Sequence, residues 1–104
     1  MFRTIWYEKY HNDFKMSTRP RPLTSAQIRA ARALIRWSAE DLARASILGV
    51  TTIRRAELTD DETSMTAANN LAVRRALEHA GVEFIDENGG GPGVRLRKRQ
   101  PKKR

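Results

Sequence analysis

The stretch that most constrains this chain is residues 38–58, SAEDLARASILGVTTIRRAEL, in which two short helical patterns are separated by a very short break. Ser38 and Asp41 have the Ser-x-x-acid spacing of a helix start, where each side chain accepts a hydrogen bond from the other residue's amide. Gly49 is a small residue with which a second helix can begin. A break of about four residues is typical of a helix-turn-helix. We therefore expect this motif, with its second helix over residues 49–58.

Composition limits both the fold and the partners of the chain. Its 104 residues, 39% of them hydrophobic, suffice for one compact domain with a modest core and leave little room for a catalytic cleft. With 20 Lys and Arg against 12 Asp and Glu, the formal charge is +8, which favours polyanionic partners. The absence of cysteine excludes disulfides and thiolate zinc sites. No apolar run approaches the ~20 residues of a membrane helix, so we expect a cytoplasmic protein with no membrane partner.

The N-terminal region differs in composition from the rest of the chain. Residues 1–16 hold five of the seven aromatic residues, namely Phe2, Trp6, Tyr7, Tyr10 and Phe14. They can form a helix that packs on the domain or on a protein partner, or they can be a leader ahead of a second start at Met16. The two prolines and flanking arginines of residues 17–23 favour an extended linker. We treat residues 1–23 as an N-terminal extension.

A first helix is predicted over residues 25–36. Thr24 or Ser25 can cap its start, and the apolar residues recur at helical spacing. The residues expected to face the core are Ile28, Ala31, Leu34 and Ile35. Arg32 lies between these positions and cannot point wholly to solvent, and a buried arginine requires a carboxylate. We expect Glu57 to be its partner in a structural ion pair, the alternative being two independent surface charges.

The C-terminal half predicts another helix, a hairpin and a basic tail. Thr63 or Ser64 can cap a helix over residues 65–80, which completes a helical domain over residues 24–81. Short strands at 82–85 and 94–97, joined by a glycine-rich loop, predict a β-hairpin over residues 82–97. Because an isolated hairpin is marginally stable, we expect it to pack on the domain or to pair with a second copy. Residues 98–104 form a basic tail, and the cations expected to contact phosphate are Arg97, Lys98, Arg99, Lys102, Lys103 and Arg104.

Five blocks of residues, in order, carry a resemblance to a known family. They are S-x-Q-I-R-A-A-R-A-L at 25–34, W-S-x-E-D-L-A at 37–43, T-I-R-R at 52–55, A-L-E-x-A-G-V-E-F-I at 76–85 and E-N-G-G-G-P-G-V-R-L at 87–96. Over residues 24–97 the chain resembles the phage-repressor-like helix-turn-helix transcriptional regulators of the Cro, or xenobiotic-response-element, type. The resemblance implies a mainly α, compact four- to five-helix DNA-binding domain with a small C-terminal β-hairpin. It also supports the pairing of Arg32 with Glu57.

The resemblance further implies how such a chain binds double-stranded DNA. The second motif helix would enter the major groove, and a homodimer would read two half-sites one helical turn apart in the nucleoid. The residues expected to contact DNA are Ser38, Gly49, Val50, Thr51, Thr52, Arg54 and Arg55. Arg54 or Arg55 could bond guanine through two hydrogen bonds, and Val50 or Thr51 could contact a thymine methyl.

The chain departs from the family pattern at several positions near the motif. Ala39 stands where the family often has a glutamine that grips the DNA backbone. Ile47 replaces the turn glycine, which is costly if this residue takes a positive φ. Gly49 replaces a capping serine, and residues 60–62 place three acids in the following loop. These departures weaken the expected grip on DNA and leave the fold unaffected.

Two functions follow from the sequence, and a third is disfavoured. The leading one is a sequence-specific DNA-binding transcriptional regulator. The alternative is a protein-interaction module of helix-turn-helix fold, such as an antitoxin or anti-activator, that binds a partner through residues 1–16. We expect no enzyme, no cofactor and no metal site, because His11 and His79 lie in unrelated segments and no catalytic group accompanies either.

Overall fold

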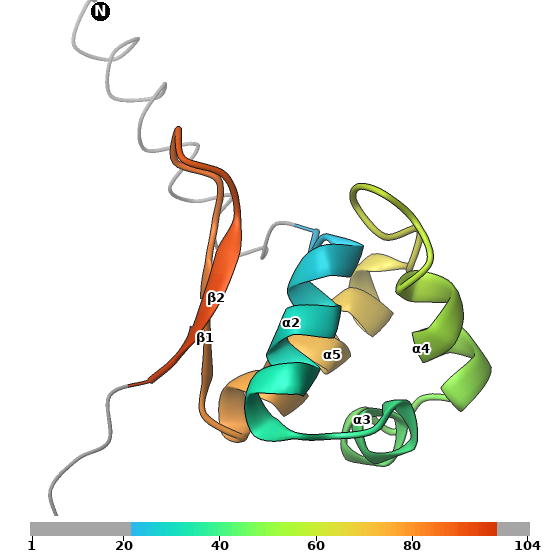
Figure 1. Cartoon of the computed structure of the whole chain (residues 1–104). Helices are drawn as coiled ribbons and strands as arrows, with labels where there is room; N and C mark the ends of the chain where they lie inside the picture. The colour runs from blue at the N-terminus through green and yellow to red at the C-terminus, as the bar shows by residue number, and fades with distance from the viewer. Residues whose placement is uncertain (1–21, 98–104) are drawn as a thin grey trace, which may run out of the picture.

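The computed structural model describes residues 22–97, and this part of the chain is mainly helical (Figure 1). Four helices are followed by two antiparallel strands: α2 (Ser25–Ile35), α3 (Ala39–Ser46), α4 (Val50–Ala56), α5 (Ala67–His79), β1 (Val82–Ile85) and β2 (Gly93–Leu96). The hairpin lies on one side of α2, and α4 lies on the other. None of these four helices is both long and apolar enough to span a bilayer. The aromatic residues 1–16 and the basic residues 98–104 lie outside the described residues.

Local chemistry sets both ends of α2. The Thr24 side chain accepts from the Gln27 amide, and the Gln27 side chain accepts in return from the Thr24 amide, so Thr24 is the cap. The helix ends at Ile35, one residue earlier than predicted, because Arg36 takes a left-handed conformation with φ 59°. The prediction that Leu34 belongs to the core is wrong, since its side chain is 40% exposed. The other three predicted core positions of this helix are fully or partly buried.

The helix α5 starts at a different residue, and with a different cap, from those predicted. Neither Thr63 nor Ser64 caps the helix, which begins at Ala67 with the Thr66 side chain accepting from the Asn69 amide. Thr63 is instead buried. Its amide donates to the Leu23 carbonyl at 3.0 Å, which holds this residue against the start of the domain. This tertiary pairing draws the segment before α5 against the start of α2.

One core lies between the helices and reaches the inner face of the hairpin. Its buried apolar residues are Leu23, Ile28, Ala31, Ala39, Leu42, Ala43, Ile53, Ala56, Val73, Ala76, Leu77, Val82 and Phe84. Leu23 is 1% exposed, so it belongs to the folded domain and not to the extension in which the sequence pattern placed it. Asn70, at 6% exposed, interrupts the apolar face of α5 and accepts from the Leu23 amide at 3.2 Å. A buried polar side chain with such a partner keeps the adjacent backbone satisfied.

The hairpin is fastened to the domain by the core and by two polar side chains. β1 and β2 pair from Val82 opposite Leu96 to Ile85 opposite Gly93, one residue earlier in the second strand than predicted. The Gln27 side chain donates to the carbonyls of Ile85 at 3.3 Å and Gly93 at 3.0 Å.

Arg74 holds the other side of the hairpin against α5. Its guanidinium lies 5.2 Å from the centre of the Phe84 ring, a cation–π distance. It also bonds Glu78 at 3.1 Å and faces Asp86 at 3.6 Å. The hairpin therefore packs on its own domain, whichever further partner it has.

Replacing Ile47 with glycine should raise the free energy of unfolding by about 1 kcal/mol. The residue has φ 59° and a side chain that is 88% exposed, so glycine relieves left-handed strain with little loss of packing. Urea unfolding measures the change. Arg36→Gly is the matched control, since Arg36 has the same φ but no β-branch and should gain less. A loss of stability in Ile47→Gly would contradict the assignment of strain to this turn.

Candidate nucleic-acid interface

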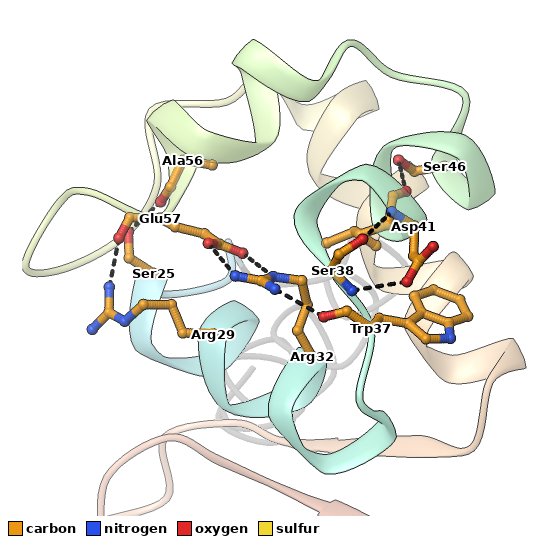
Figure 2. Close-up of polar contacts among 10 residues, drawn as sticks. Ser25, Arg29, Arg32, Trp37, Ser38, Asp41, Ser46, Ala56 and Glu57 are labelled. Atoms are coloured by element: carbon orange, nitrogen blue, oxygen red, sulfur yellow. Dashed lines mark hydrogen bonds and ion pairs between the residues drawn. The ribbon is translucent and has the colours of Figure 1, made fainter.

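The helix α3 begins with the predicted pair of reciprocal bonds. The Asp41 amide donates to the Ser38 hydroxyl at 3.0 Å, and the Ser38 amide donates to the Asp41 carboxylate at 2.9 Å (Figure 2). The pKa of Asp41 lies below its usual value, mainly because its carboxylate accepts the hydrogen bond from the Ser38 backbone amide and also because of its bond with the Ser38 side chain. The start of α3 is thus fixed by its own sequence.

A turn of three residues joins α3 to α4. The Ile47 and Leu48 amides donate to the carbonyls of Arg44 at 3.3 Å and Ala43 at 2.9 Å, which closes the end of α3. Gly49 then precedes α4 without a side-chain cap. The second helix is shorter than the predicted 49–58, because it begins at Val50 and ends at Ala56. The two helices pack on each other, as the sequence predicted.

The helix α4 has one buried side and one polar, exposed side. Ile53 is 0% exposed and Ala56 is 1% exposed. At 3.6 residues per turn, the face opposite these two carries Thr51, Arg54 and Arg55, which are all exposed. Val50 and Thr52 flank this face and are half-buried. The structure therefore brings five of the predicted DNA-contacting residues onto one short helix, and places Ser38 and Gly49 before the starts of the two motif helices.

An ion pair between Arg32 and Glu57 joins α2 to the end of α4 (Figure 2). Two parallel bonds connect the side chains, from Nε to Oε2 at 2.7 Å and from the NH2 group to Oε1 at 2.8 Å. The same guanidinium donates to the Trp37 carbonyl at 2.8 Å. Arg29, one turn earlier on α2, donates to the Glu57 carbonyl at 2.6 Å. The pair is mostly buried, with side-chain exposures of 22% for Arg32 and 9% for Glu57.

Ser25 adds further bonds at the same junction. Its buried hydroxyl bonds the Ala56 carbonyl, at the last residue of α4 (Figure 2). It also lies 2.5 Å from the Thr59 hydroxyl. Its amide donates to the Asp61 carbonyl at 3.1 Å. Both the last turn of α4 and the loop after it are therefore anchored to α2.

The sequence did not predict an ion pair between Glu40 of α3 and Arg54 of α4. The two side chains are 51% and 58% exposed, and they join across the turn between the motif helices. A hydrogen bond from its own backbone amide, followed by the charge of Arg54, lowers the pKa of Glu40. Arg55 has no ion pair or hydrogen bond from its side chain within residues 22–97. The two neighbouring arginines of α4 therefore differ in environment.

The folded part of the chain is electrically balanced. Residues 22–97 contain ten arginines and ten acidic residues, so the formal charge of +8 resides entirely in residues 1–21 and 98–104. Asp60, Asp61 and Glu62 are exposed in the loop after α4. Of the cations expected to contact phosphate, only Arg97 lies within residues 22–97, and its guanidinium donates to the Glu78 carbonyl at 3.2 Å.

A shallow groove lies between α3 and α5, apart from the exposed face of α4. Its volume is about 420 Å³, and it is lined by Trp37, Ala45, Ser46, Ala72, Arg75, Ala76, His79 and Ala80. Small apolar side chains form most of this surface. Within the part of the chain that the structure describes, no group of acidic and histidine side chains has the arrangement of a metal site.

No protein-family model matches the chain, and the curated proteins contain no significant match. The resemblance to repressor-like regulators therefore remains a prediction from the five sequence blocks.

Replacing Glu57 with glutamine should lower the free energy of unfolding by about 2 kcal/mol, because it leaves the mostly buried Arg32 cation without its counter-charge. Urea unfolding monitored by circular dichroism gives the value. Glu83→Gln, which removes the exposed pair with Arg95, is the matched control and should cost much less, because solvent screens an exposed pair. Equal losses in the two variants would contradict a structural role for the Arg32–Glu57 pair.

Proposed function

We propose that this chain is a sequence-specific DNA-binding transcriptional regulator that places α4 in the major groove. The observation that carries the proposal is the exposed face of α4, where Thr51, Arg54 and Arg55 lie opposite a fully buried side. A short helix with such a face, packed on a preceding helix across a tight turn, has the geometry used to read base edges. The basic ends of the chain add attraction for a polyanion.

In the proposed mechanism, some residues position the protein on the DNA backbone and others contact the bases. Ser38 and Gly49 lie just before the two motif helices, where backbone amides can bond phosphate oxygens. Arg55 can donate two hydrogen bonds to guanine, and Thr51 or Val50 can place a methyl group against thymine. Thr52, at the edge of the face, is suited to the adjacent phosphates. Each of these contacts requires α4 to keep a fixed orientation, which the bonds from α2 provide.

A homodimer is part of the proposal. The reading helix has seven residues and can span only a few base pairs, so specificity requires two copies on adjacent half-sites. The hairpin of residues 82–97 offers a surface for pairing, because neither of its strands pairs with a third strand within residues 22–97. Leu96 on β2 is 51% exposed and adds apolar surface there.

The groove between α3 and α5 favours a second function, the protein-interaction module. A shallow apolar surface bordered by Trp37 and Arg75 can receive a partner helix without involving α4. Two variants distinguish the functions. Ala45→Glu in the groove and deletion of residues 1–16 should each leave DNA binding intact, while partner capture through the groove or through the aromatic segment fails.

Arg55→Ala should weaken binding to the preferred sequence by about ten- to a hundredfold, the usual contribution of a bidentate arginine–guanine contact. The preferred duplex is first selected from a random library, and gel shifts then give both the affinity and the number of chains per duplex. Arg75→Ala on α5 removes the same charge away from α4 and is the matched control. Unchanged sequence preference in Arg55→Ala would remove the reading role from this face.

Replacing the five cations of the tail with glutamine should reduce the salt dependence of DNA binding and leave the preferred sequence unchanged. The replaced residues are Lys98, Arg99, Lys102, Lys103 and Arg104. Each phosphate contact contributes about 0.9 to the slope of log affinity against log salt, so up to about 4.5 is lost. Titrations at several salt concentrations measure the slope. An unchanged slope would show that the tail does not contact DNA.

A further inference from the structure

We propose that Glu40 determines specificity by holding Arg54 against α3, which withholds this cation from DNA phosphates and leaves Arg55 as the arginine that reads a base. The inference rests on the proposed function. It concerns the one ion pair that joins the two motif helices within residues 22–97, and it assigns different roles to two adjacent arginines.

The geometry separates the two side chains. Arg54 and Arg55 are consecutive, so they point about 100° apart around the helix. Arg54 is directed toward the first turn of α3, where its guanidinium meets the Glu40 carboxylate. Arg55 is directed away from that pair, and no acidic side chain within residues 22–97 bonds it. One arginine is therefore occupied and its neighbour is available.

The charge of Glu40 makes it unfavourable for Arg54 to leave the ion pair for a DNA phosphate. An exposed ion pair contributes little stability by itself, so a phosphate contact could offset its loss. Release of Arg54 to a phosphate has a second cost, because it leaves the Glu40 carboxylate uncompensated beside a polyanion. A hydrogen bond from its own backbone amide, followed by the charge of Arg54, lowers the pKa of Glu40 and so favours its charged form. Together these two costs disfavour a non-selective contact by Arg54.

The consequence falls on specificity more than on affinity. When α4 is seated on its preferred sequence, the contact of Arg55 with a base fixes the position of Arg54, whereas in a non-selective complex a free Arg54 can contact whichever phosphate lies nearest. A free Arg54 therefore strengthens non-selective binding more than selective binding, and holding it on Glu40 increases the difference between the two affinities. Residues 22–97 have no net charge, so few unpaired cations on this face can attract DNA. Whether Arg54 is free or paired therefore changes a large part of that attraction.

Glu40→Gln tests the proposal in the full-length chain. The amide keeps the shape of the side chain but loses the charge that holds Arg54. Affinity for a scrambled duplex should rise about three- to tenfold, the salt slope should steepen by about one, and affinity for the selected duplex should rise less. Glu83→Gln is the matched control, because it removes one acid from an equally exposed pair with Arg95 on the hairpin, on the far side of α2 (Figure 1).

The Arg54→Ala background shows whether Glu40 acts through Arg54. In that background, Glu40→Gln should change binding no more than Glu83→Gln does. An effect that persists there would mean that Glu40 repels DNA directly, which overturns the proposal. So would equal effects of Glu40→Gln and Glu83→Gln in the otherwise unaltered chain. A wild-type chain without any sequence preference would overturn the proposed function and, with it, this inference.

Discussion

The arrangement of this domain depends on the ion pair between Arg32 and Glu57. The helix α4 has seven residues, far fewer than an isolated helix needs to be stable in water, so its position must come from tertiary contacts. Burial of Ile53 and Ala56 holds its inner side, but apolar packing alone permits rotation and sliding. The bidentate pair fixes its last turn to a single place on α2. The orientation of the exposed face follows from that place.

The turn before α4 contributes less to this arrangement than its position suggests. Ile47 has a left-handed conformation that disfavours a β-branched residue, and Gly49 supplies no side-chain cap for α4. Both features destabilise the motif when it is considered alone. The capping bonds of Ser38 and the anchoring of Glu57 therefore hold the motif from its two ends. This division explains how α3 and α4 keep their packing across a turn that has a left-handed isoleucine and no side-chain cap for α4.

The predictable parts of the structure are those encoded by local patterns. The cap at Ser38 and both strands of the hairpin follow from spacing and turn residues, and the pairing of Arg32 with Glu57 follows from the cost of burying a charge. Tertiary context determined the rest. Leu23 enters the core because the segment before α5 pairs with it, and the pair of Glu40 with Arg54 depends on the angle between two helices. The spacing of residues in the sequence does not predict the angle between α3 and α4.

The distribution of charge differs between the folded domain and the ends of the chain. A balanced surface over residues 22–97 attracts a polyanion weakly, so the DNA contacts that we propose for α4 depend on specific geometry. The excess of cations lies in the terminal segments, where attraction is independent of sequence and sensitive to salt. Under the proposed function, two free arginines on α4 would turn this surface into a general phosphate binder. The ion pair of Arg54 with Glu40 would then keep the contribution of α4 dependent on the base that Arg55 contacts.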